Sequence, residues 1–425
     1  MPYSTTVIMM LLLISRVSAF TRTTTTSQLT RQYSSKLFAS TTTTISFDPS
    51  IDVRDKATST LVIGRHSTLK SLIEQQDSYV SLFGFRPHPD ILSSMHESIS
   101  GNQATTSHVI VPTVGPAIPR PPHRLTLCSL QNKVTRNNHP LSLHSMTDLV
   151  KSSVKGKGPV RIMVCVEDEY PLGPIAGAIG RAFPLFNKKT KSKKTESEDE
   201  DNEEEERMIH VTFLDSKGRV VKNDVEINAA AEAAEGVRLA CRLVDTHPEE
   251  LTTTAFAQEC HDLFDDDETV TIEEIVGDEL KEKGYGGIYN VGKGATHPPR
   301  LVIMTYEPPK DVLTEEDEEQ SAITLVGKGI VYDTGGLAIK SRVGMCGMKH
   351  DMGGAAGVLG GFTAAVRLRT PRKIRLMLCL AENAIGPKSV RNDDIITQYS
   401  GKTVEINNSD AEVSSSCDWC VVASC

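Results

Sequence analysis

The sequence predicts an α/β protein of two domains, a smaller N-terminal α/β domain and a C-terminal domain built on a mixed sheet. Its 425 residues exceed the length of a usual single domain. Short apolar runs at 60–63, 109–114 and 160–166 alternate with helical stretches such as 90–99. Farther along, residues 322–380 read as strand, small-residue helix and strand.

The composition excludes some classes of function. A net charge of −9 argues against nonspecific nucleic-acid binding. The nine cysteines are mostly single residues in apolar segments, as at Cys165, Cys241 and Cys379, which indicates reduced thiols rather than a disulfide framework. Cys417 and Cys420 form one CxxC pair, a weak metal or redox signal on its own.

Residues 1–45 read as a targeting presequence, since no Asp or Glu precedes Asp48. The apolar run 7–14 is too short to span a bilayer but suits a signal peptide, and Ala19 before Phe20 offers a cleavage site. The basic, Ser/Thr-rich stretch that follows has transit-peptide composition, and the whole resembles bipartite plastid presequences. We expect import into a plastid or other organelle and no membrane segment in the mature chain. A mitochondrial presequence, or a cytoplasmic protein with a disordered tail, are the alternatives.

Residues 46–235 are expected to form the N-terminal α/β domain, without a catalytic constellation. Within it, residues 188–206 are a run of lysines followed by acids, a low-complexity insert that stays solvated. Six histidines of the domain do not share a compact ligand spacing, so surface or core roles are favoured over metal binding; these six are His88, His96, His108, His123, His139 and His144.

Helical, alanine-rich sequence at 228–245 is expected to link the domains, and residues 249–264 continue helical. Residues 285–299 contain a Gly-rich turn that superficially resembles a phosphate-binding loop. The P-loop spacing, four residues between the first glycine and Gly-Lys-Ser/Thr, is absent, which excludes that interpretation.

The stretch 325–362 carries most of the candidate chemistry. Lys328, Asp333, Lys340 and Asp351 lie along a glycine-rich backbone there. We expect a strand at 322–326, an N-cap at Asp351, a helix at 352–368 and a second strand at 373–380. Ligands of such βαβ-like units gather at the carboxyl ends of the strands, where these charged residues fall.

A further strand is expected at 404–412, ending in the carboxylates Asp410 and Glu412. Together with Asp333 and Asp351 they place four acids in one domain. Two divalent cations would neutralise them better than protein groups alone. The residues therefore predict a dinuclear metal site.

Two other interpretations compete. Asp333-Thr334-Gly335 has the look of an aspartic protease motif, but that mechanism needs two such carboxylates and the chain has no second Asp-Thr-Gly. In a purely structural interpretation the glycines and acids only build tight turns, which does not explain two lysines and four acids in this order.

In these blocks the chain resembles the leucyl aminopeptidase family (peptidase family M17, the cytosol aminopeptidases), nearest its probable aminopeptidase-like branch. The resemblance covers roughly residues 235–412, so that 236–412 would be an M17-like metallopeptidase domain. The blocks that carry it are E-G-V-R-L-A-C-R-L-V-D-T-H-P, the G-I-Y-N-V-G-K-G segment, G-K-G with D-T-G-G, D-M-G-G-A-A-G, and N-S-D-A-E.

The resemblance implies a metal-dependent aminopeptidase that releases N-terminal residues from peptides by a water molecule activated between two ions, manganese or zinc. Lys340 would stay protonated and stabilise the oxyanion as the catalytic lysine, since no carboxylate lies near it in sequence. Met348 would line the first specificity pocket. The N-terminal domain would pack subunits into a homo-hexamer. The implied metal ligands are Lys328, Asp333, Asp351, Asp410 and Glu412.

The chain departs from the family after Glu412. The family continues as D-A-E-G-R-L with a functional arginine, whereas here Val413 and Ser414 follow. Ser414 has neither the charge nor the fork of a guanidinium. Residues 413–425 resemble nothing in the family and read as an aberrant tail, so we expect a catalytic domain incomplete at its C-terminus. An inactive family member acting as a scaffold or assembly subunit is therefore the alternative function.

Overall fold

The computed structural model describes residues 43–49, 57–75, 82–83, 87–111, 122–133, 141–155, 158–167, 171–186, 207–318 and 320–411. They divide into two compact units, one within residues 41–235 and one from Gly236 onward. The boundary falls inside the helix Asp224–Asp245. Most of the expected presequence, the acidic insert and the tail from Glu412 lie outside the described residues.

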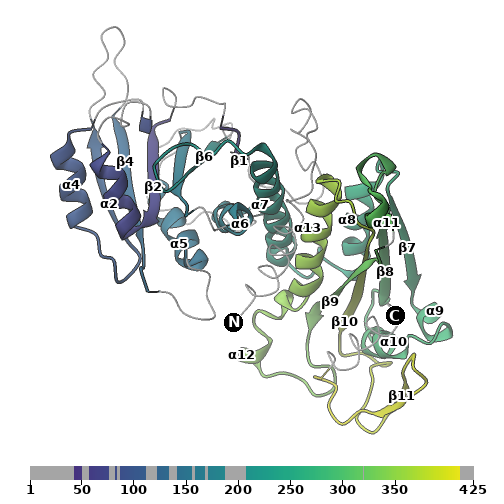
Figure 1. Ribbon diagram of the computed structural model, residues 1–425. Coiled ribbons are helices and arrows are strands. Elements are labelled where there is room, and N and C mark those ends of the chain that lie inside the picture. The colour runs from purple at the N-terminus through teal and green to yellow at the C-terminus, as the bar shows by residue number, and fades with distance from the viewer. Residues whose placement is uncertain are drawn as a thin grey trace, which may run out of the picture. The chain divides into compact units, whose positions relative to one another are not determined.

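The N-terminal unit is built on a six-stranded sheet of order β1-β6-β5-β2-β4-β3 (Figure 1). All neighbouring strands are parallel except β3 and β4. Its elements are β1 (Thr43–Ser46), β2 (Ser59–Arg65), α2 (His66–Glu74), α4 (Pro89–Glu97), β3 (Thr105–Val111), β4 (His123–Leu130), α5 (Leu143–Ser153), β5 (Val160–Cys165), α6 (Leu172–Gly180), β6 (Arg207–Leu214) and the start of α7 (Asp224–Asp245).

Helices cover both faces of this sheet. Leu69 of α2 and Leu92 of α4 pack with Leu125 and Leu127 of β4 in one apolar cluster. Cys128, the next residue along β4, points to the opposite face and contacts Ser153 at the end of α5. Strands buried on both faces read as continuous apolar runs, which is why 160–166 could be recognised as a strand.

The C-terminal unit contains a four-stranded mixed sheet of order β7-β8-β10-β9 and a small hairpin, β11 with β12. Only β9 and β10 are parallel. Its elements after α7 are α8 (Thr253–Phe264), β7 (Val270–Val276), α9 (Asp278–Glu282), α10 (Gly286–Gly292), β8 (Arg300–Tyr306), η2 (Lys310–Val312), α11 (Glu315–Glu318), β9 (Ile323–Asp333), α12 (Arg342–Met345), η3 (Met348–His350), α13 (Gly353–Arg367), β10 (Ile374–Asn383), β11 (Ile395–Thr397) and β12 (Thr403–Glu405).

This sheet lies between two helical layers, as Figure 1 shows for α8 and α13 on one side and α9 and α10 on the other. Phe256 of α8 and Phe362 of α13 belong to the larger core, together with Leu378 of β10. Ile288 of α10 packs on the other face with Cys379 of β10. The mixed α/β fold predicted from the sequence is confirmed. Because helices cover the two faces of the sheet, the carboxyl ends of β9 and β10 are where a site is expected.

Several expected elements differ in extent. The first described strand, β1 (Thr43–Ser46), overlaps the last three residues of the expected presequence, which ends at 45. The expected Gly-rich turn at 285–299 contains α10. The strand expected at 322–326 continues to Asp333. The strand expected at 404–412 ends at Glu405 because the next residues form turns.

Candidate functional site

Lys328 lies in β9 between two glycines that allow a helix to pack directly on the strand. A Cβ at Gly327 would lie 2.6 Å from the Cα of Ala355 in α13, and one at Gly329 would lie 3.3 Å from the Cβ of Ala355 and 2.8 Å from the carbonyl oxygen of Cys379 in β10. Only glycine permits so close an approach. The Gly-Lys-Gly motif therefore holds the start of α13 against β9 and leaves Lys328 as the first side chain of the site.

A β-bulge in β9 brings Asp333 to the same face of the sheet as Lys328. Ile330 pairs with Ala381 of β10, but Asp333 pairs with Asn383, so β9 contains one extra residue between them. Side chains of a regular strand alternate, and residues five apart would face opposite ways. The extra residue shifts the alternation by one position, so the side chains of Lys328 and Asp333 lie on the same face of the sheet.

The two oxygens of the Asp333 carboxylate have different partners. The side chain is 2% exposed. Its Oδ1 accepts hydrogen bonds from the Gly335 N–H and from Asn383 Nδ2, each at 2.8 Å. Its Oδ2 lies 2.9 Å from Lys340 Nζ. Oδ1 is thus held by two neutral N–H donors, whereas Oδ2 faces the ammonium group of Lys340.

Lys340 contacts two acids, although none lies near it in sequence. Its ammonium forms ion pairs with Asp333 and with Asp410. Burial alone would lower the pKa of Lys340, but the hydrogen bonds and charges of Asp410 and Asp333 outweigh it and raise the pKa. Nothing in the sequence pointed to these long-range partners, and the expected protonated state of Lys340 agrees with the raised pKa.

Asp351 follows the short helix η3 and contacts the lysine of β9. Its Oδ1 lies 2.7 Å from Lys328 Nζ. The expected N-cap role is wrong, because Met352 is the N-cap of α13 and makes no side-chain cap bond. Turn η3 is fastened by Lys349, which donates to the carbonyl of Asp245 at 2.5 Å. Met348, the expected specificity residue, is half-buried at the start of this turn.

Asp410 lies in a turn rather than on a strand. Its N–H donates to Asn408 Oδ1 at 3.0 Å, an Asx-type bond that competes with extended structure. Ser409 ties this turn to the chain before Lys340, since its hydroxyl donates to Gly335 O and accepts from the Ala338 N–H, both at 2.8 Å. Glu412, the fifth expected ligand, lies outside the described residues.

The sequence interpretation missed Asn383 and Ser409. Asn383 ends β10, is 2% exposed, and bonds to both Asp333 and the carbonyl of Ser409. A polar residue at the carboxyl end of the strand neighbouring β9 was the available signal. Ser409 stood inside the recognised N-S-D-A-E block and was passed over because only its charged neighbours suggested chemistry.

The donor set suits a divalent cation. Asp333 and Asp410 each place an oxygen on the same ammonium, so both can reach one cation, and Lys328 lies beside Asp351 as a second donor pair. Among the described residues, no three His, Cys, Asp or Glu side chains gather closely enough to hold one ion. In this arrangement the Lys340 ammonium lies between Asp333 and Asp410.

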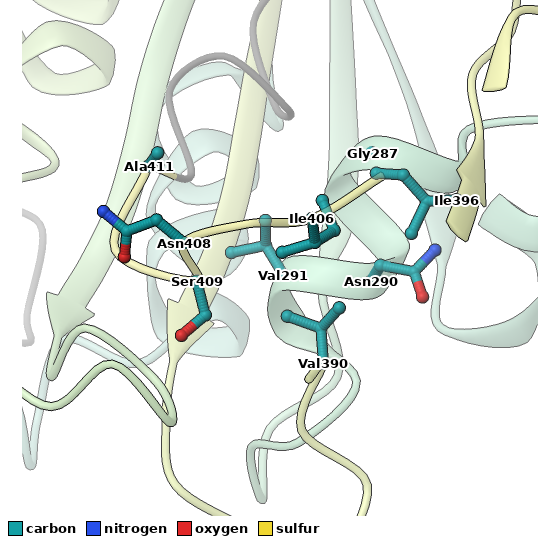
Figure 2. A pocket seen from close by; sticks show the side chains of 9 residues that line it. All are labelled: Gly287, Asn290, Val291, Val390, Ile396, Ile406, Asn408, Ser409 and Ala411. Atoms are coloured by element: carbon teal, nitrogen blue, oxygen red, sulfur yellow. The ribbon is translucent and has the colours of Figure 1, made fainter. Parts of the chain in front are cut away.

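A separate small pocket borders the turn of Asp410. Figure 2 shows side chains from α10, from the hairpin region and from that turn converging on it. Its walls are mainly apolar and carry no charged side chain, so it lacks the groups for acid–base or metal chemistry. The lining residues are Gly287, Asn290, Val291, Val390, Ile396, Ile406, Asn408, Ser409 and Ala411.

None of the helices in the described ranges is both long and apolar enough to cross a membrane.

Comparison with known proteins identifies a family for the C-terminal unit. Residues 238–413 match the catalytic domain of the cytosol aminopeptidase family. The chain is 41% identical over 291 residues to the probable aminopeptidase NPEPL1 of Homo sapiens, covering 68% of this chain and 52% of that protein. It is 34% identical over 363 residues to leucine aminopeptidase 1 of Caenorhabditis elegans, covering 85% and 66% respectively.

The fold agrees with solved structures. The apo leucyl aminopeptidase of Trypanosoma cruzi aligns with a TM-score of 0.68 at 30% identity, covering 88% of this chain and 69% of that one. The chain spans about half the length of the NPEPL1 proteins that it matches.

Proposed function

Because the chain belongs to the cytosol aminopeptidase family (peptidase family M17), we propose that it is a metal-dependent aminopeptidase that releases N-terminal amino acids from peptides. The proposed metal ligands for two manganese or zinc ions are Lys328, Asp333, Asp351, Asp410 and Glu412.

One observation carries this proposal: Lys340 lies between the carboxylates of Asp333 and Asp410, while Lys328, on the same strand as Asp333, pairs with Asp351. Asp333 and Asp410 both contact the charged nitrogen of Lys340, so their carboxylates lie close enough together to bind a metal cation as well. The side-chain exposures of Asp410 and Asp351, 30% and 22%, leave a route for solutes.

Each residue of the site has a role in the proposed reaction. Bound at these residues, divalent ions would acidify a water molecule and polarise the peptide carbonyl. Lys340, with its raised pKa, keeps its proton at neutral pH and can stabilise negative charge on the carbonyl oxygen. Asp333 presents Oδ2 to the site while Oδ1 stays bonded to the protein. Met348 borders the side chain of the first substrate residue.

The test is an assay of purified, metal-free protein on leucyl substrates before and after addition of MnCl₂ or ZnCl₂. Metal-dependent release of the leaving group is expected, with little remaining in Lys340→Ala. Wild-type protein that binds metal without turnover would contradict the proposal and support the non-catalytic scaffold.

Two further properties are proposed from the family and the N-terminal composition. A homo-oligomer, a hexamer by family resemblance, is expected in light scattering of the purified protein, and a monodisperse monomer would contradict it. Residues 1–45 are expected to direct a fluorescent fusion to a plastid or other organelle, and uniform cytoplasmic fluorescence would contradict that.

A further inference from the structure

Asn383 joins three segments of the site although it carries no charge. It is the last residue of β10 and is 2% exposed. Its side-chain nitrogen lies 2.8 Å from Asp333 Oδ1 and 3.0 Å from the carbonyl oxygen of Ser409. One amide group thus contacts the acid at the end of β9 and the turn that carries Asp410.

Both partners of this amide can only accept hydrogen bonds. A carboxylate oxygen and a peptide carbonyl need donors, so the amide must turn its nitrogen toward them and use both of its N–H groups. The amide oxygen then lies toward Gly336, where a Cβ would come within 2.9 Å of it. Gly336 has a φ of +61°, a conformation that favours glycine. The orientation of Asn383 is therefore set on both sides.

The backbone around Asn383 strengthens the same junction. Its carbonyl oxygen accepts from the Thr334 N–H at 3.0 Å and from Thr334 Oγ1 at 2.7 Å. The hydroxyl of Ser409 in turn bonds to Gly335 O and the Ala338 N–H. The end of β10, the chain from Asp333 to Lys340 and the turn of Asp410 are thus linked by hydrogen bonds between buried groups.

We propose that Asn383 is a positioning residue of the proposed metal site: its amide holds Asp333 Oδ1, which leaves Oδ2 turned toward Lys340 as a candidate metal donor, and it holds the carbonyl of Ser409, the residue before Asp410. This inference deepens the proposed aminopeptidase function and rests on it. Groups that orient metal ligands typically change metal affinity by about 10–100-fold when they are removed.

Isothermal titration calorimetry, with MnCl₂ titrated into metal-free protein, measures manganese affinity and tests this role without requiring turnover. Asn383→Leu keeps most of the buried volume and removes both donors, and Asn383→Ala removes the volume as well. We expect manganese to bind about 10–100-fold more weakly to both variants. A residue that only fills space would leave the affinity of Asn383→Leu unchanged, and that result would overturn the proposal.

A matched control is Asn290→Ala. Asn290 is a half-buried amide of the same unit, donating to Gly286 O at 2.7 Å and accepting from Lys293, and its hydrogen bonds involve none of the proposed ligands that the structure describes. Its manganese affinity should equal that of the wild type. An equal loss in Asn290→Ala and Asn383→Leu would show that any lost amide weakens binding, which overturns a specific role for Asn383.

A second variant covers the case in which substitutions of Asn383 unfold the protein, judged by the thermal midpoint of the metal-free forms. Ser409→Ala keeps the carbonyl and removes the hydroxyl that fastens the same turn, so it should also weaken manganese binding, by about tenfold. Unchanged manganese affinity in Ser409→Ala would contradict the proposal that these hydrogen bonds position the metal ligands. Wild-type protein that binds no manganese contradicts the proposed function itself, whereas wild-type binding with unaffected variants contradicts only the role of Asn383.

Discussion

Two charged clusters of the C-terminal unit contain similar side chains in different surroundings. Arg242 of α7 and Glu259 of α8 form a doubly hydrogen-bonded ion pair whose side chains are 2% and 0% exposed. Lys340 instead contacts two acids, Asp333 and Asp410, whose side chains are 2% and 30% exposed. The first cluster is closed to water and matched one to one. The second is partly open and shares one cation between two carboxylates.

The difference teaches that burial and pairing, rather than residue type, separate a structural ion pair from a candidate site. A fully buried pair leaves no route for a ligand, and removing either partner strands a charge in the interior. A partly exposed cluster with more acids than bases retains affinity for a further cation. Substitutions in the first cluster should therefore change stability, and those in the second should change binding and turnover.

Asp333→Asn is expected to have the largest effect, because Asp333 is the most deeply buried of the described proposed metal ligands, with a side chain 2% exposed. Metal-dependent kcat/KM on leucyl substrates should fall by roughly 10⁴-fold, about 5.5 kcal/mol. The thermal midpoint of the metal-free protein should change less than in Glu259→Gln, because Lys340 keeps its ion pair with Asp410. Retention of more than a tenth of wild-type kcat/KM would remove Asp333 from the metal site.

Glu259→Gln should have the next largest effect, on stability alone. It leaves Arg242 charged and without its carboxylate in the interior, which typically costs about 3–5 kcal/mol of unfolding free energy. Urea denaturation measures that loss, and calorimetry on the folded variant should give the wild-type manganese affinity. If Glu259→Gln bound manganese more weakly under conditions in which the variant is fully folded, the proposed difference between the two clusters would be wrong.

Lys340→Met should separate catalysis from metal binding within the second cluster. Loss of one group that stabilises an oxyanion lowers kcat by about 10²–10³-fold. Manganese affinity should stay the same or increase, because the ammonium no longer competes for Asp333 and Asp410. A parallel loss of manganese binding would mean that Lys340 acts as a ligand, against the role proposed for it.

Glu382→Gln should give the smallest effect, through pH. Burial raises the pKa of Glu382, and the charge of His297 only partly opposes this. The unfolded chain loses the proton near the ordinary value of 4.5, whereas the folded chain keeps it to higher pH. Stability is therefore lost as pH rises from 4.5 through the raised folded pKa.

Urea denaturation at several pH values checks this dependence. Relative to wild type, Glu382→Gln should gain stability between acidic and neutral pH, on the order of 1 kcal/mol or less. Parallel curves for Glu382→Gln and wild type would show that the carboxyl does not contribute.

The sequence predicted the parts of the site that depend on residue order. The strand that carries Lys328 and the small-residue helix α13 follow from apolar periodicity and glycine spacing. Both elements are present in the structure. The β-bulge that turns Asp333 to the face of Lys328 could not be predicted, because it is a feature of pairing with β10 rather than of β9 itself.

Long-range hydrogen bonding explains the remaining differences. Lys340 meets Asp410 across seventy positions of sequence, and Asn383 meets Ser409 across twenty-six, contacts that no local pattern encodes. The strand expected at Asp410 was wrong because Asn408 bonds the local backbone and favours a turn. Charge identified the acids of the site, whereas the neutral groups that orient them became visible only from the packing.

Anomalous diffraction from crystals of the protein soaked in MnCl₂ locates bound ions directly. Two manganese peaks are predicted, bordered by the side chains of Lys328, Asp333, Asp351 and Asp410. Well-ordered carboxylates with no manganese beside them, or manganese bound only at other acids of the chain, would contradict the metal site on which the proposed activity depends.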